Sequence, residues 1–180
     1  MTEDAGSTRD PRRRYDDLLV ESTTERLPAA ELASLHESNE AVREGWVAAA
    51  VVLDPDERVL LVDLEGYDGW VAPGGTARPG ERLRDAAVRE VREETGVDIV
   101  PERPHLLAEE RFVAADGTVP AASFQVVVFS ASAEDGAVGS PASLGVDHET
   151  VHDVGWFEEL PPDVYGRDRV VRVLTRIRDE

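Results

Sequence analysis

Three glutamates stand close together in one stretch of the chain, at positions 90, 93 and 94. The hydrophobic pattern predicts a helix from about Glu81 to Thr95, stopped by Gly96, where a left-handed C-cap is favoured. With residue 81 at zero and 100° per residue, the three glutamates fall at roughly 180°, 120° and 220°. They therefore border the apolar face of the helix, whereas Arg89 falls among the arginines on the solvent-facing side.

Carboxylates in this arrangement need a counter-charge. Neighbouring glutamates at i, i+3 and i+4 repel one another by about 0.2–0.5 kcal/mol per pair even when they are exposed. Half-buried carboxylates must shift toward the neutral form or bind a cation. Oxygen ligands of this kind suit Mg²⁺ or Mn²⁺. From the helix alone, a solvated charged face with ion pairs such as Arg89–Glu93 is about as good an interpretation.

The wider spacing favours the metal site. The segment from Gly75 to Val97, GTARPGERLRDAAVREVREETGV, resembles the Nudix box G-x5-E-x7-R-E-U-x-E-E-x-G-U, where U is a bulky aliphatic residue. All nine specified positions are met, and the preceding Trp70-x-x-Pro73-Gly74 also resembles the usual approach to this box. The chain thus resembles Nudix hydrolases from about Trp46 to Phe157.

The resemblance implies roles for individual residues. Metal ligands would be Glu90, Glu93 and Glu94, together with backbone at Gly75 and a carboxylate from a loop outside the box, for which Glu149 is the candidate. Glu109 and Glu110 are rivals for that last position. The catalytic set would be Glu90, Glu93 and Arg89: one glutamate, commonly the first, helps to deprotonate water, and the arginine orients the carboxylates. Glu81 would support the start of the helix or contact the metal through water.

The implied reaction is metal-dependent hydrolysis of a nucleoside diphosphate linked to another group, NDP-X to NMP plus phospho-X, by attack of water on phosphorus. Nucleoside triphosphates, including oxidised ones, and sugar nucleotides are open as substrates. The alternative is a non-catalytic Nudix-fold module that senses a nucleotide. A third interpretation, isopentenyl diphosphate isomerase, is disfavoured because that chemistry is associated with a cysteine and the chain has none.

Several other residues could contribute to binding, although each has a plainer explanation. The aromatic residues Tyr67, Trp70 and Phe124 could stack on a base, but core packing is the commoner fate of such side chains. Arg78 could touch phosphate or simply be exposed. The four histidines, His36, His105, His148 and His152, have no convincing metal-ligand spacing.

The elements that must position these residues follow from the hydrophobic pattern. We predict strands at 46–53, 58–64, 106–114, 124–131 and 151–157 and a terminal helix at 165–178. With the central helix, these imply an α/β fold, a Nudix-type α/β/α sandwich with a mixed central sheet. Before them we expect an N-terminal helical extension at 1–45, followed by the Nudix domain at 46–180. Within the extension, a short helix would begin at Pro11, with Asp10 as its N-cap, and run through Tyr15 and Leu19, and a second helix would span 28–43. The extension could form a homodimer.

The composition is strongly acidic, with 19 basic and 38 acidic residues and a formal charge of −19. All the basic residues are arginines. Such a surface resembles that of proteins from halophilic archaea and suits a salt-rich cytoplasm, where self-repulsion is screened. Long nucleic acids are disfavoured as partners because backbone binding needs clustered cations. The chain also lacks an apolar stretch long enough for a membrane span, so we expect a cytoplasmic protein that acts on a small nucleotide-like diphosphate.

Overall fold

The computed structural model describes residues 9–146 and 149–180. The elements in chain order are η1 (Pro11–Arg13), β1 (Leu19–Leu27), α1 (Ala29–Ser38), α2 (Glu40–Glu44), β2 (Trp46–Leu53), β3 (Val59–Leu64), β4 (Trp70–Val71), β5 (Gly74–Thr76), α3 (Leu83–Thr95), β6 (Ile99–Ala114), β7 (Ala122–Ala133), η2 (Pro141–Ser143), β8 (Val151–Phe157) and α4 (Arg167–Asp179).

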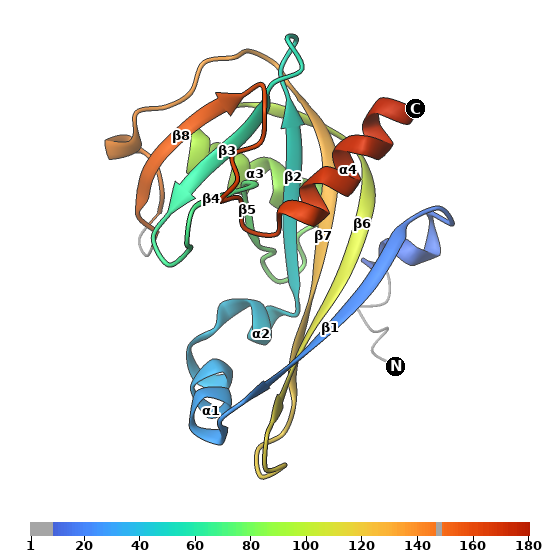
Figure 1. Cartoon of the computed structure of the whole chain (residues 1–180), viewed down its shortest axis with the longest axis vertical. Helices are drawn as coiled ribbons and strands as arrows, with labels where there is room; N and C mark the ends of the chain where they lie inside the picture. Colours follow the sequence, from blue (N-terminus) through green and yellow to red (C-terminus); the bar gives the residue numbers. More distant parts are fainter. Residues whose placement is uncertain (1–8, 147–148) are drawn as a thin grey trace.

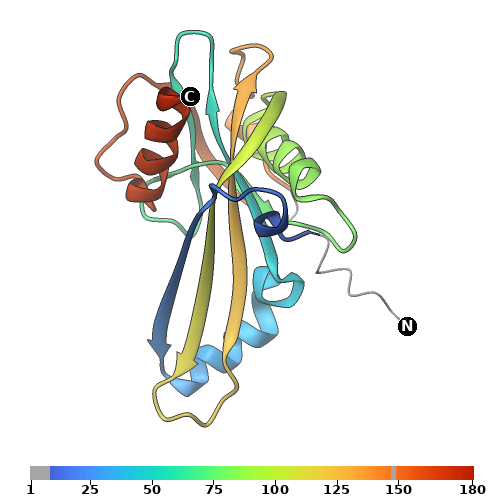
Figure 2. The ribbon, with the colours of Figure 1, turned by 90° about the vertical axis from the view of Figure 1, so that its right-hand side faces the viewer.

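The strands form one mixed sheet of eight, in the order β1-β6-β7-β2-β3-β4, with β5 paired to β2 and β8 paired to β3. The pairs β1–β6 and β2–β7 are parallel, and the other strand pairs are antiparallel. The helix α3 lies on one side of the sheet and α4 on the other (Figure 2). The predicted α/β/α sandwich with a mixed central sheet is therefore confirmed.

Alternation along β2 sends its side chains to both helical layers. Val51 belongs to the core that includes Val173 of α4, whereas Ala50 and Val52 pack in the core that includes Val91 of α3. Because both faces of β2 are covered, its sequence is an almost unbroken apolar run. That run anchors the central helix, which carries the glutamates, against the middle of the sheet.

Three long strands, β1, β6 and β7, run on beyond the two helical layers (Figure 1). There Leu32 of α1 is fully buried against Ala114 and Ala122, in a small core of its own. We call this part the distal lobe, residues 25–45 and 110–124. It brings the N-terminal segment next to residues that follow the central helix.

The first predicted helix is wrong beyond its first turn. Asp10 does cap a short turn, Pro11–Arg13, because its Oδ1 accepts a hydrogen bond from the Arg12 N–H at 3.0 Å. The chain then enters β1, and Leu19 pairs with Leu106 of β6 instead of lying on a helix. Residues 20–24 are rich in β-branched side chains, and the free edge of β6 makes a strand the better solution. The segment before residue 46 is thus not purely helical; a division of the chain at residues 45 and 46 stays a prediction.

The second predicted helix, 28–43, divides at Asn39. This residue has extended backbone, with φ −86° and ψ 115°, which ends α1. Its side-chain oxygen accepts a hydrogen bond from the Val42 N–H at 3.0 Å and so caps α2. The break redirects the chain, so that Glu40 begins a new helix beside the sheet.

The other predicted elements are present, with shifted ends in some cases. The strands β2 and β8 have the predicted bounds, whereas β6 begins seven residues earlier than predicted, at Ile99, and α3 begins at Leu83 rather than Glu81. The short strands β4 and β5 were not predicted. In the described ranges, 9–146 and 149–180, no helix combines the length and apolar character that a membrane crossing requires.

Candidate active site

The helix α3 presents two of its glutamates to the protein interior. Leu83, Ala87 and Val91 pack on the sheet and fix how the helix is rotated. Gly96 ends the helix in the left-handed conformation, with φ 75°, as the sequence predicts. In this orientation Glu90 is 5% exposed and Glu94 only 1%. The predicted position at the border of the apolar face is therefore found for both residues.

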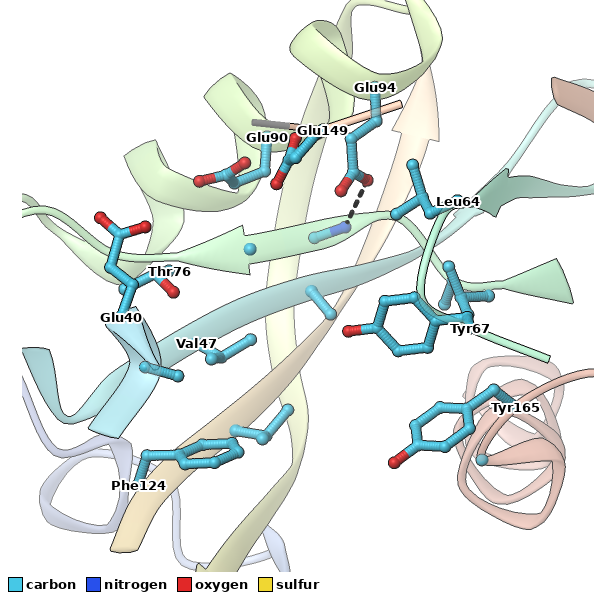
Figure 3. A pocket seen from close by; sticks show the side chains of 18 of the residues that line it. Glu40, Val47, Leu64, Tyr67, Thr76, Glu90, Glu94, Phe124, Glu149 and Tyr165 are labelled. Carbon is cyan, nitrogen blue, oxygen red and sulfur yellow. Dashed lines mark hydrogen bonds between the residues drawn. The ribbon is translucent and has the colours of Figure 1, made fainter. Parts of the chain in front are cut away.

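Glu149 joins these two glutamates from a separate loop. One carboxylate oxygen from each of Glu90, Glu94 and Glu149 lies within 4.8 Å of the others, and Figure 3 shows the three side chains converging above β5. The loop is tied to the helix because the Gly145 N–H donates to the Glu93 carbonyl at 2.8 Å. The loop candidate from the sequence thus lies beside two of the box glutamates.

Two glycines of β5 let the backbone approach these carboxylates closely. The Gly74 N–H donates to Glu94 Oε2 at 2.9 Å. A Cβ added at Gly75 would lie 2.5 Å from Glu90 Cδ, so only glycine leaves room for that carboxylate. Pairing of β5 with Ala48 and Ala49 of β2 holds both glycines in place.

Arg89 connects the acidic residues of the box. Its Nε and Nη2 donate to the two carboxylate oxygens of Glu81 at 2.9 and 2.8 Å. Its Nη1 donates to Glu90 Oε1 at 2.5 Å and to Glu93 Oε2 at 3.1 Å, and Nη2 also reaches the Thr76 carbonyl at 3.1 Å. The side chain is only 17% exposed, so its predicted position on the solvent face is wrong. The loop before α3 folds over it.

Glu93 lies apart from the converging carboxylates. Its two oxygens bind arginines, Oε2 to Arg89 and Oε1 to Arg78 Nη2 at 3.4 Å. The structure therefore brings together Glu90, Glu94 and Glu149 and places Glu93 at their flank, within the same cavity lining. The ion pair Arg89–Glu93 that the sequence suggested is present.

The electrostatics of the cluster favour bound positive charge. Burial raises the pKa of Glu90 to about 7, despite the neighbouring Arg89. Burial also holds the pKa of Glu94 well above its ordinary value, although the hydrogen bond from the Gly74 N–H opposes this. Partial burial, followed by the charge of Glu93, raises the pKa of Glu149. By contrast, the hydrogen bonds that Arg89 donates to Glu81 lower the pKa of Glu81.

One carboxylate oxygen of the cluster lacks a hydrogen-bond partner. Glu94 Oε1 is buried and has no hydrogen-bond partner among the described residues. A buried acceptor left without a partner costs about 1–3 kcal/mol. A divalent cation would satisfy this oxygen and favour the charged form of all three carboxylates. The donor set, oxygen atoms only, fits Mg²⁺ or Mn²⁺.

These carboxylates line one end of a cavity of about 630 Å³. Tyr67 lies on its wall, edge to face with Tyr165 at 5.2 Å between ring centroids. Phe124 lines the opposite end, and Glu40 lies between it and Glu90 (Figure 3). Trp70 instead packs on Phe157 at 4.7 Å, with the core beside α4. Of the three predicted aromatic residues, two therefore face the cavity.

The remaining candidates have other partners. Glu110 lines the cavity but forms an ion pair with Arg169 at 2.5 Å, and Glu109 is not part of the lining. His105 is buried against Ser130, and His36 contacts the Pro120 carbonyl. His152 is exposed, and His148 lies outside the described residues. Sequence reasoning missed Glu40 and Tyr165, because nothing near either residue in the chain points to a site.

Comparisons with known proteins agree with this geometry. A family model described as the NUDIX domain matches residues 43–171. The chain is 36% identical over 110 residues to the uncharacterized Nudix hydrolase YvcI of Bacillus subtilis, a match that covers 61% of this chain and 67% of that protein. It is 45% identical over 60 residues to human diphosphoinositol polyphosphate phosphohydrolase 2, covering 31% of this chain and 33% of that protein.

Solved structures share the fold. A UDP-X diphosphatase has a TM-score of 0.55 at 19% identity, with 85% of this chain and 72% of that chain covered. A NUDIX-family hydrolase from Clostridium perfringens has a TM-score of 0.56 at 14% identity, with 74% and 98% covered. Because the family model matches well over half of the chain and the box residues surround one cavity, the chain belongs to the Nudix family of hydrolases.

Proposed function

We propose that the protein hydrolyses a nucleoside diphosphate linked to a second group, NDP-X, to NMP and phospho-X, with Mg²⁺ or Mn²⁺ as cofactor. The observation that carries the proposal is the convergence of Glu90, Glu94 and Glu149 at one end of a cavity. The buried, unpartnered oxygen of Glu94 supports a bound cation there. The name of one fold neighbour, a UDP-X diphosphatase, is in keeping with such substrates.

The residues around the carboxylate cluster have different proposed roles. The Gly74 N–H orients Glu94, and Arg89 orients Glu90 and Glu93. Glu90 is the proposed base that takes a proton from the attacking water, because it lies among the converging carboxylates and Arg89 holds its orientation. Glu93 stands next to it as a further ligand or base, and the Gly75 backbone lies open to metal or phosphate.

A divalent cation bound to these carboxylates would neutralise phosphate charge and activate the attacking water. Cations on the protein would add to that effect. Arg78, which lines the cavity beside Glu93, is placed to contact a phosphate oxygen. The substrate is a small molecule, since the cavity matches the size range of small-ligand sites.

The test is a panel of nucleoside triphosphates, oxidised nucleotides and NDP-X compounds, assayed for released nucleotide with Mg²⁺ and with excess chelator. We expect turnover of at least one NDP-X compound, abolished by chelator and reduced about a hundredfold or more in Glu94→Gln. The control is Glu37→Gln, which makes the same change at an exposed position on α1. Binding of a nucleotide without turnover in the folded wild type would instead favour a sensing module.

The acidic composition supports a salt-rich cytoplasm as the setting of this reaction. High ionic strength shortens the range of repulsion between exposed carboxylates to a few ångströms. We therefore expect both the melting temperature and the turnover to rise as KCl is increased from 0.1 to 2 M. A protein whose stability is insensitive to KCl would contradict this setting.

A further inference from the structure

The cavity continues past the carboxylate cluster into the distal lobe. At that far end it is lined by Glu25 of β1 and Glu110 of β6, beside Phe124 of β7. Glu40 of α2 lies on the way there, close enough to Glu149 for the two charges to repel each other. Figure 3 shows Phe124 on the side of the cavity away from Glu94, with the Glu40 side chain between Phe124 and Glu90. A substrate whose diphosphate lies at the cluster would therefore place one of its two flanking groups, the nucleoside or the second group X, among these residues.

The far end keeps negative charge that no cation on the protein balances. Three arginines line the cavity, and each is already paired: Arg78 with Glu93, Arg89 with the box glutamates, and Arg169 with Glu21 and Glu110. Glu25 and Glu40 make no ion pair with any other residue in the described part of the chain. A metal at the cluster would offset Glu90, Glu94 and Glu149 but would leave these two carboxylates uncompensated.

The floor of the far end is apolar. The Phe124 ring is half-buried and stacks on Phe112, with centroids 6.0 Å apart and an interplanar angle of 29°. Val47 and Val126 continue this surface toward the cluster. An apolar floor rimmed by carboxylates suits a ring that carries hydroxyl groups. The ring's C–H face can pack on Phe124, and its hydroxyls can donate hydrogen bonds to the carboxylates.

We propose that X, rather than the nucleoside, occupies the far end, that this end selects an X that is an uncharged, hydroxyl-bearing ring such as a sugar, and that Glu25 and Glu40 reject X groups carrying negative charge. This inference rests on the proposed function and narrows it. The expected substrates would thus differ from that of a relative such as diphosphoinositol polyphosphate phosphohydrolase 2, whose name describes a polyphosphorylated substrate.

The test compares matched substrates that differ by one charge. Each nucleoside diphosphate hexose is assayed beside the corresponding hexuronate, in which a carboxylate replaces one hydroxymethyl group. We expect kcat/KM to be about tenfold lower for the hexuronate, on the scale of one charge repelled across a few ångströms at partial exposure. Diphosphoinositol polyphosphates should show no turnover. The hexuronate penalty should shrink as KCl is raised from 0.1 to 1 M, because screening weakens the repulsion.

Substitutions at Glu40 test whether this residue causes the lower kcat/KM for hexuronates. Glu40→Gln and Glu40→Arg should raise the hexuronate-to-hexose ratio of kcat/KM about threefold and tenfold, respectively. The matched changes Glu37→Gln and Glu37→Arg alter the same net charge on exposed α1 and should leave that ratio as in the wild type. Equal kcat/KM for hexose and hexuronate in the wild type would overturn the inference while leaving the proposed function in place. Absence of turnover on every pair would overturn both.

Discussion

The carboxylate of Glu90 lies directly over the Cα of Gly75, so closely that a Cβ there would come within 2.5 Å of Glu90 Cδ and 2.6 Å of Oε2. These residues are the first glycine of the box and its second glutamate. Their contact explains why a glycine is needed fifteen residues before Glu90. The glycine acts through space on the glutamate rather than by adopting an unusual backbone conformation.

Gly75→Ala should therefore impair catalysis more than folding. The atoms in the way belong to the end of a flexible side chain, which can move aside at little cost in stability. We expect kcat/KM to fall about tenfold to a hundredfold, because the displaced carboxylate no longer meets its partners, with a melting temperature within a few degrees of the wild type. Gly136→Ala, where a Cβ meets nothing within 4 Å, is the control. Full activity in Gly75→Ala would contradict the role given to this contact.

Glu94→Gln should separate metal binding from folding. Glutamine keeps an acceptor for the Gly74 N–H but removes a buried charge whose pKa is already raised by burial. Without metal, the variant should be at least as stable as the wild type. A ligand at a hundred times its Kd stabilises by about 2.7 kcal/mol, and thermal unfolding should show this Mg²⁺ response in the wild type and in Glu37→Gln but not in Glu94→Gln. An undiminished response in Glu94→Gln would place the metal elsewhere.

The pH dependence of stability should report Glu90. Its pKa is raised from about 4.5 when unfolded to about 7 in the metal-free fold. Between these values the folded state binds more protons than the unfolded state, so this group's contribution to the free energy of unfolding falls as pH rises. Denaturant unfolding in the presence of chelator measures this. The free energy of unfolding of Glu90→Gln, relative to that of the wild type, should increase from pH 5 to 7 and stay constant above pH 7. A constant difference would show that the Glu90 pKa is not raised.

Arg89→Lys should damage both stability and activity. A single ammonium group cannot replace a guanidinium that binds Glu81, Glu90 and Glu93 at once. Partly buried carboxylates left without their partner should lower the free energy of unfolding by roughly 2–4 kcal/mol, with kcat/KM reduced more than tenfold. Arg84→Lys, at an exposed position on the same helix, should change neither. Retained stability in Arg89→Lys would mean that the ion pairs are not what holds the loop to the helix.

Glu93→Gln should lower turnover by about two orders of magnitude. Glu93 lies beside the cluster, bound to Arg89 and Arg78, so this variant asks whether it approaches the reacting atoms during catalysis. The measurement is kcat with saturating Mg²⁺ and substrate. A wild-type kcat would leave Glu93 with only the task of positioning the two arginines.

The sequence predicted the elements whose pattern is decided locally. The apolar run of β2 and the glycine that ends α3 are read directly from neighbouring residues. The strand β1 was missed because Tyr15, Leu18 and Leu19 have helical spacing. Only the open edge of β6, whose residues pair with β1 from positions 87 further along the chain, decides otherwise. An edge strand with one exposed face carries little pattern of its own.

The site residues were likewise predicted where the pattern is local and missed where it depends on distant parts of the chain. Spacing along one helix was enough to identify Glu90 and Glu94 as inward-facing carboxylates. The helical wheel placed Arg89 in solvent because it contains no information about the loop that folds over that side chain. The pairing of Tyr67 with Tyr165 joins segments almost a hundred residues apart, which no local pattern can anticipate.

The cavity wall in the distal lobe has a consequence for how such a protein can diverge. Glu25 and Glu40 precede residue 43, where the match to the family model begins, whereas the box lies wholly inside that match. Leu32 and its neighbours give this wall a small core separate from those under α3 and α4. On the proposed role of Glu25 and Glu40, substitutions before residue 43 change which second group the cavity accepts while the sequence of α3 stays the same. Exchanging this segment between related proteins should then exchange their substrate preferences.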